Sequence, residues 1–131
     1  MIHQEELMDL ARRYTAAWGS QDAASVAACY SADGSLSVNA GAPAVGRDAI
    51  AQTARSFMTA LPDMLVIMDG LLIQGDGAVY QWTLIAKQIR ISGFEEWQIG
   101  ADGLIAQSRG HFDSAGYERQ LKHGAGDSFP A

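Results

Sequence analysis

Cysteine is almost absent from this sequence, and so are the motifs that bind metals and cofactors. Cys29 is the only cysteine, so the chain has no disulfide framework and no Cys/His spacing that matches a zinc site. Its neighbours Val26, Ala27, Ala28 and Tyr30 indicate a buried structural thiol rather than a nucleophile. No glycine-rich loop introduces a helix in a βαβ unit, and no motif suggests a Ser/His/Asp triad. We therefore expect neither a metal nor a cofactor.

Positive charge is also scarce. The chain has 9 Lys and Arg residues against 15 Asp and Glu residues, which gives a net charge of -6, and its basic residues form no cluster. Nucleic acids and anionic membranes are bound through positive patches that displace counterions. We therefore expect a partner that is a small molecule or a second copy of the chain.

Long apolar runs are missing as well. No stretch is apolar enough to span a bilayer, and Met1 to Glu6 contain neither the basic nor the apolar region of a signal peptide. These features predict no membrane partner and a cytoplasmic location.

What the chain has is enough apolar sequence for one core. Of its 131 residues, 48% are hydrophobic and 18% are charged, which is typical of a globular protein and too apolar for a disordered one. This length leaves room for a single domain. We assign residues 1–121 to that domain and 122–131 to a flexible C-terminal tail.

Helices and strands are segregated rather than alternating in the predicted order of elements. Apolar residues recur at helical spacing over residues 5–18 and 47–61, and Asp22 is suited to cap a shorter helix between them. Alternating and apolar segments then predict strands over these residues: 35–39, 64–73, 78–86, 88–99 and 104–112. Asp113 can cap a last helical turn that continues to Leu121. Segregated helices and an antiparallel meander indicate the α+β class.

Two features of the strands carry further expectations. Gly70 and Gly93 interrupt apolar strands, which predicts bulges or bends that curl the sheet around a cavity. Residues 83–91 contain no turn residue where an antiparallel meander has to reverse. Either this ribbon is one very long strand, or a loop near Lys87 is missing from the sequence, and we favour the missing loop.

Four short motifs connect this order of elements to a known family. They are Tyr14–Trp18, Tyr30–Gly34, Gly46–Ile50 and Arg109–Asp113. With them the chain resembles the nuclear transport factor two-like superfamily, and within it the SnoaL-like proteins of the polyketide cyclase type, from about Leu7 to Leu121. The resemblance implies a cone-shaped fold in which a curved mixed or antiparallel sheet packs against three N-terminal helices. It also implies a homodimer through the outer face of the sheet.

The resemblance suggests site residues, each with a structural alternative. Tyr14 matches a tyrosine that donates a hydrogen bond to an enolate in the ketosteroid isomerases, and it equally suits a core tyrosine. Asn39 matches a pocket asparagine of the epoxide hydrolases, and it equally suits a turn. Residues 79–86 hold neither an Arg nor a carboxylate, which excludes the Asp/Arg/Asp relay of those hydrolases.

The usual catalytic acid of the family is absent, because Gly110 stands where many SnoaL-like proteins have a carboxylate in the last strand. Glu95 and Glu96 offer a replacement, since neighbours in a strand point to opposite faces and only one of them can face inward. The resemblance favours Glu95, whose burial would raise its pKa and suit it to act as a general base. The alternative is that both glutamates form ion pairs with Arg90 or Arg109 across strands.

The remaining candidates are expected to hold the ligand. Gln81 and Thr83 share one face of their strand and can donate hydrogen bonds to a carbonyl, while Tyr80, Trp82 and Leu84 share the other face. Other residues expected to bind the ligand are Trp18, Phe57, Ser108 and Phe112. If Gly110 faces inward, Arg109 and His111 face outward.

Two functions stay open at this point. The first is cofactor-independent acid/base chemistry on a ketone or polyketide-like substrate, such as an isomerisation, a cyclisation or a dehydration, with Glu95, Tyr14 and Asn39 as the catalytic residues. The second is a ligand-binding or dimerisation module that keeps the fold and performs no reaction. Because the usual acid is absent at Gly110, the sequence does not decide between these two functions.

Overall fold

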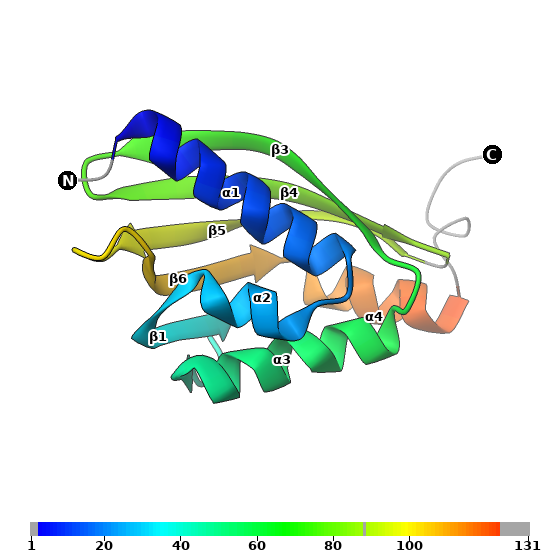
Figure 1. Cartoon of the computed structure of the whole chain (residues 1–131). Helices are drawn as coiled ribbons and strands as arrows, with labels where there is room; N and C mark the ends of the chain where they lie inside the picture. Colours follow the sequence, from blue (N-terminus) through cyan, green and yellow to red (C-terminus); the bar gives the residue numbers. More distant parts are fainter. Residues whose placement is uncertain (1–2, 88, 124–131) are drawn as a thin grey trace.

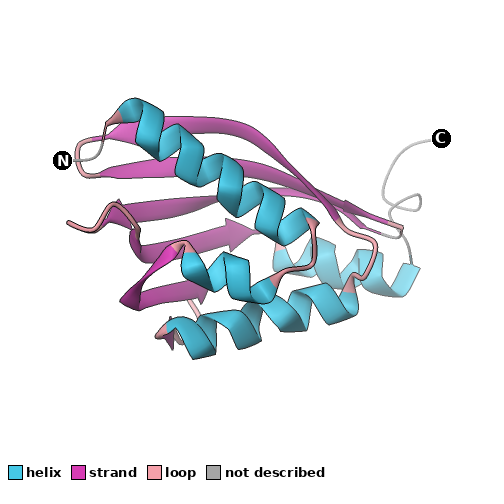
Figure 2. Cartoon of the chain, in the orientation of Figure 1, coloured by secondary structure: helices cyan, strands magenta, loops and turns pink. Residues whose placement is uncertain are grey.

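A computed structural model describes residues 3–87 and 89–123 and arranges them as helices on a single sheet (Figures 1 and 2). The helices are α1 (Gln4–Gly19), α2 (Ala23–Ala28), α3 (Arg47–Ala60) and α4 (Ser114–His123). The strands are β1 (Tyr30–Val38), β2 (Ala44–Val45), β3 (Leu65–Gln74), β4 (Gly77–Ala86), β5 (Ile89–Ile99) and β6 (Ile105–Phe112). None of the helices in these ranges has the length and apolar character to cross a membrane. The cytoplasmic location stays a prediction.

The sheet is mixed and has the strand order β2-β1-β6-β5-β4-β3. Strands β3 to β6 form the expected antiparallel meander, and β1 adds to it in parallel with β6. The expected strand over 35–39 is part of β1, which begins earlier, at Tyr30. The α+β class and the mixed sheet are confirmed.

The first three helices supply the apolar layer that covers one face of the sheet (Figure 1). Helix α1 buries one stripe, with Leu10, Ala11 and Tyr14 fully shielded from solvent. Helix α2 is held at its start by the Asp22 carboxylate, which accepts a hydrogen bond from the Ser25 N–H at 3.1 Å. These apolar stripes explain why the helices dock on the sheet instead of extending into water.

The two strand glycines have different roles. The β3·β4 register shifts between Met68 and Gly70, so the bulge expected there is confirmed. Around Gly93 the pairing is regular, with Trp82 opposite on β4 and Phe112 opposite on β6. A Cβ atom at Gly93 would lie 2.6 Å from Trp82 Cζ2, so this glycine makes room for a ring that lies over it. A bulge at Gly93 is therefore wrong, and the bend expected as its alternative stays a prediction.

The chain reverses near Lys87. Strand β4 ends at Ala86 and β5 begins at Ile89, and these two residues pair, so β4 and β5 are separate strands joined by a connection that includes Lys87. The interpretation of one very long strand is therefore wrong, and the missing loop stays a prediction. The Lys87 N–H donates to the Asp63 carboxylate at 2.8 Å, which anchors the start of the connection, and residue 88 lies outside the described residues. Helix α4 continues past Leu121 to His123, and the expected tail beyond it also lies outside them.

Candidate functional site

A cavity lies between the helices and the sheet, and its walls are almost entirely apolar. The volume open to the centre of a water molecule is about 70 Å³. The lining residues are Trp18, Leu36, Val38, Phe57, Val66, Tyr80, Trp82, Leu84, Glu95, Gly110 and Phe112. Trp18, Phe57 and Phe112 were expected to bind a ligand, and they lie on this wall. Glu95 is the one ionisable carboxylate among the lining residues.

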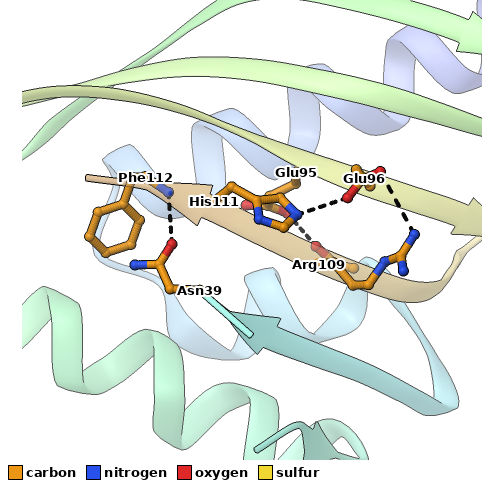
Figure 3. Close-up of polar contacts among 7 residues, drawn as sticks. Asn39, Glu95, Glu96, Arg109, His111 and Phe112 are labelled. Carbon is orange, nitrogen blue, oxygen red and sulfur yellow. Dashed lines mark hydrogen bonds and ion pairs between the residues drawn. The ribbon is translucent and has the colours of Figure 1, made fainter. Parts of the chain in front are cut away.

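Glu95 and Glu96 point to opposite faces of β5. Glu95 is 8% exposed and lines the cavity, whereas the Glu96 side chain is 42% exposed on the outer face. Glu96 Oε1 lies 2.8 Å from His111 Nε2, and its Oε2 lies 3.7 Å from Arg109 Nη2 (Figure 3). The ion-pair interpretation is therefore right for Glu96 and wrong for Glu95. Arg109 and His111 face outward, as expected.

One oxygen of Glu95 is held by a set of donors. Its Oε1 accepts hydrogen bonds from the Tyr14 hydroxyl at 2.9 Å, the Trp97 Nε1–H at 2.9 Å and the Ser108 hydroxyl at 2.7 Å. The other oxygen, Oε2, has no hydrogen-bond partner among the residues that the structure describes. The Glu95 side chain borders the cavity. A ligand in the cavity would therefore meet a carboxylate whose Oε1 is hydrogen-bonded and whose Oε2 has no partner among the described residues.

Burial sets the proton affinity of this carboxylate. Desolvation raises the pKa of Glu95 above its ordinary value, and the hydrogen bonds from Trp97, Ser108 and Tyr14 oppose that rise. A carboxylate with a raised pKa binds a proton more readily than one in water, which is the property that a general base needs. Burial, and next to it the charge of Glu95, raises the pKa of Tyr14 well above its usual value, so this hydroxyl keeps its proton and donates it.

Sequence analysis missed two members of this cluster. The Tyr30 and Tyr14 hydroxyls lie 2.9 Å apart, and because Tyr14 gives its only proton to Glu95, Tyr30 is the donor between them. Trp97 could have been found from strand alternation, because it lies two residues after Glu95 and therefore on the same face. Tyr30 had no such signal, since it reaches the cluster from β1. Ser108 was expected to contact a ligand, and it contacts Glu95 instead.

Two residues expected to bind the ligand, Gln81 and Thr83, lie away from the cavity. Tyr80, Trp82 and Leu84 line it, so Gln81 and Thr83 between them face the outer side of β4. There the Thr83 hydroxyl bonds to Ser92 Oγ at 2.7 Å. The structure therefore places Gln81 and Thr83 outside this cavity, because the larger aromatic side chains take the buried face.

Asn39 has the turn role. Its φ angle is 50°, a left-handed conformation that asparagine tolerates, and its Oδ1 accepts a hydrogen bond from the Phe112 N–H at 2.8 Å (Figure 3). This contact fastens the end of β1 to the end of β6, and Asn39 is not part of the cavity lining. A catalytic role for Asn39 is not supported by this position.

We expect Asn39→Ala to lower the free energy of unfolding by about 1–2 kcal/mol, because it leaves the Phe112 N–H without its acceptor and places alanine at a positive φ. Urea unfolding measures this loss. Asn39→Asp is the matched control, since its carboxylate can accept the same bond. Equal losses in the two variants would contradict the assignment.

Within residues 3–87 and 89–123, no group of three or more His, Cys, Asp or Glu side chains is arranged to hold a metal ion. The ionisable cluster at the cavity consists of Glu95 and hydroxyl or indole donors. Such a set can accept, hold and return a proton, which is the chemistry available from the side chains present.

Comparison with known proteins identifies relatives by sequence family and by fold. The sequence model of the SnoaL-like domain matches residues 11–108 of the chain. No curated protein sequence gives a significant match.

Solved structures show the same fold at low sequence identity. TsrD from Streptomyces laurentii is 21% identical with a TM-score of 0.79, over 92% of this chain and 98% of that one. A protein from Jannaschia sp. CCS1, named as a SnoaL-like polyketide cyclase, is 11% identical with a TM-score of 0.80, over 89% and 92%. A protein from Catenulispora acidiphila DSM 44928 with a ketosteroid isomerase-like fold, in complex with trimethylamine, is 15% identical with a TM-score of 0.80, over 93% and 98%. At these identities the likeness concerns the fold alone.

Proposed function

The chain belongs to the SnoaL-like domain family, and on that premise we propose that it catalyses cofactor-independent proton transfer on a small ketone or polyketide-like substrate. Glu95 is the general base in this proposal. The observation that carries it is the single carboxylate at an apolar cavity, with Oε1 fixed by three donors and Oε2 free. A pocket that only bound an apolar ligand would have no need for this charge, which is costly to bury.

The reaction begins with removal of a proton from the carbon next to the substrate carbonyl. Glu95 Oε2 takes the proton, the C–H electron pair forms a carbon–carbon double bond, and the carbonyl π electrons move to oxygen to give an enolate. Return of the proton to another carbon completes an isomerisation, and its transfer to a departing hydroxyl completes a dehydration. Attack of the enolate on a second carbonyl forms a carbon–carbon bond and an alkoxide, and the alkoxide takes the proton from Glu95 to complete a cyclisation. Glu95 is regenerated in each case.

The position of Gly110 supports the catalytic interpretation. In the family resemblance the acid belongs at Gly110, and the β5·β6 register pairs Gly110 directly with Glu95. Both residues line the cavity, and a Cβ at Gly110 would lie 3.7 Å from Glu95 Cγ. In this proposal Glu95, on the neighbouring strand and bordering the same space, takes the place of the acid that the family resemblance puts at Gly110.

Exchange of α-hydrogen for deuterium tests this proposal. We expect the protein to accelerate exchange of 2-tetralone in D₂O, followed by proton NMR, above the rate in the same buffer with an equal concentration of free acetate. Native mass spectrometry of the purified protein searches in parallel for a co-purified ligand. No acceleration together with measurable binding of the ketone would favour the alternative, a ligand-binding module without a reaction.

A homodimer through the outer face of the sheet is the second part of the proposal. Large apolar side chains are exposed on that face, at Leu65 (55%), Ile67 (41%), Leu72 (55%) and Phe94 (40%). A cluster of such residues on a sheet face is typical of an interface between copies of a chain.

We expect the wild type to sediment as a dimer and Phe94→Asp to sediment as a monomer, because the new charge would be buried without a partner. Leu121→Asp is the matched control, since Leu121 is 39% exposed but lies on α4, away from the sheet face. A monomeric wild type, or dissociation of both variants, would contradict this interface.

A further inference from the structure

Trp82 carries a buried hydrogen-bond donor, the N–H of its indole ring. Its Nε1 is shielded from water and has no hydrogen-bond partner among the described residues. Buried donors are nearly always paired, because an unpaired one loses its bond to water without replacement. Two other donors near the cavity do have partners, since Trp97 Nε1 is bonded to Glu95 and the Tyr80 hydroxyl lies 2.6 Å from Thr15 Oγ1.

The Trp82 indole lies on the wall of the cavity, on the same face as Glu95. On β4, Tyr80 pairs with Glu95 and Trp82 pairs with Gly93, so the two side chains occupy successive inward positions of neighbouring strands. A Cβ at Gly93 would lie 2.6 Å from Trp82 Cζ2. Because one ring carbon separates Cζ2 from Nε1, the N–H edge of the indole is turned toward β5, the strand that carries Glu95.

We infer that the Trp82 Nε1–H donates a hydrogen bond to the carbonyl oxygen of the substrate while Glu95 Oε2 faces the hydrogen on the adjacent carbon. The inference rests on the proposed function and deepens it by naming the ligand class, a small and otherwise apolar molecule with a carbonyl and an α-hydrogen. Neighbouring strands lie about 4.8 Å apart. A carbonyl group and its α carbon can bridge a donor and a base on such strands.

The same contact assists the reaction. Negative charge develops on the carbonyl oxygen as the proton leaves, and a donor in a water-poor site stabilises that charge more than the neutral ketone. The N–H is already shielded from water in the free protein, so a carbonyl oxygen reaches it only after a small movement of the cavity wall, and the bond then forms without stripping water from the N–H. Apolar ligands without an acceptor gain no such bond.

The indole N–H resonance of Trp82 in the wild-type protein tests the inference directly. The chain has three tryptophans, and Trp82→Phe identifies the resonance that disappears. We expect a downfield shift of this resonance on addition of 2-tetralone and no comparable shift with tetralin, the hydrocarbon of similar shape that lacks the carbonyl. Equal shifts with both molecules would overturn the inference, as would failure of millimolar 2-tetralone to bind or to move the resonance.

Affinity gives a second measurement. Loss of one hydrogen bond between neutral groups predicts that Trp82→Phe binds 2-tetralone about fivefold more weakly. The affinity for tetralin is expected to stay within twofold, which controls for a change in the shape of the cavity. An equal loss for both ligands would overturn the inference. Deuterium exchange separates this inference from the proposed function. A shifted Trp82 resonance without accelerated exchange would support carbonyl binding at Trp82 and contradict the proposed reaction.

Discussion

Glu95→Gln is expected to reduce proton transfer by a factor of about 10² to 10⁴, the range typical for loss of a general base. An amide cannot accept a proton near neutral pH, yet its oxygen can still receive the hydrogen bonds that Tyr14, Trp97 and Ser108 now give to Oε1. The fold and the cavity should therefore persist. The measurement is α-hydrogen exchange of 2-tetralone, and unchanged exchange would remove Glu95 from the mechanism.

The same variant should be more stable than the wild type at neutral pH. Burial raises the pKa of Glu95 above 4.5, so the folded state binds this proton more tightly than the unfolded state does. Stability contributed by the protonated carboxyl is then present below pH 4.5 and is lost as the pH rises through the higher folded value. Glutamine carries no charge, so the variant does not lose this stability as the pH rises. A difference of one pKa unit between the folded and unfolded states corresponds to about 1.4 kcal/mol of folding stability.

Thermal unfolding between pH 4 and 8 measures this difference. We expect the midpoint of Glu95→Gln to exceed that of the wild type by a few degrees at pH 8, with the gap closing toward pH 4. Glu96→Gln is the matched control, because Glu96 is half-exposed on the outer face. This variant should show neither the pH-dependent difference in unfolding midpoint from the wild type nor a change in the rate of α-hydrogen exchange. A Glu95→Gln protein that is less stable at pH 8 would show that the ionised carboxylate stabilises the fold.

The predictability of this site differs from residue to residue for physical reasons. Strand alternation alone separates Glu95 from Glu96, but it cannot say which of them faces inward. That choice depends on the β5·β6 register, which pairs Glu95 with Gly110 on the cavity wall. The family resemblance favoured Glu95 and left Glu96 open, and the register seen in the structure decides for Glu95.

The face of β4 was predicted wrongly because chemistry was weighed above burial. Gln81 and Thr83 are natural ligand donors, which favoured placing them in the pocket. Tyr80 and Trp82 carry much more apolar area than Gln81 and Thr83. The free energy gained by shielding that area from water decides which face of β4 is buried. The donor that the pocket does offer is part of one of these aromatic rings, Trp82 Nε1.

Of the donors to Glu95, a local pattern could have found only Trp97, which lies two residues away on the same strand. Tyr14 comes from α1, Ser108 from β6 and Trp97 from β5 itself, and Tyr30 joins them from β1. Helices and strands are recognised from periods of a few residues, whereas this cluster depends on pairing across the sheet and on the docking of α1. Fold class was therefore accessible from the sequence, and the network around the carboxylate was not.

Gly93→Ala is expected to cause the largest loss of stability among these variants, about 2–4 kcal/mol. The added Cβ would lie 2.6 Å from Trp82 Cζ2 and 3.0 Å from Phe112 Cβ, and it would also meet the backbone oxygen of His111. Gly93 is paired on both sides, with Trp82 and Phe112, so its backbone cannot shift without breaking a ladder. The indole would have to move, and the cavity wall that it forms would move with it.

Gly110→Ala provides the contrast that makes this prediction specific. A Cβ at Gly110 would lie 3.5 Å from the Ser37 backbone oxygen and 3.7 Å from Glu95 Cγ, which are ordinary contacts. Alanine restricts the unfolded chain more than glycine, so this variant should match or exceed the wild type by up to about 1 kcal/mol. Urea unfolding compares the two variants. Equal stabilities of Gly93→Ala and Gly110→Ala would show that β5 accommodates a Cβ at residue 93. That result would contradict the placement of the Trp82 ring over Gly93.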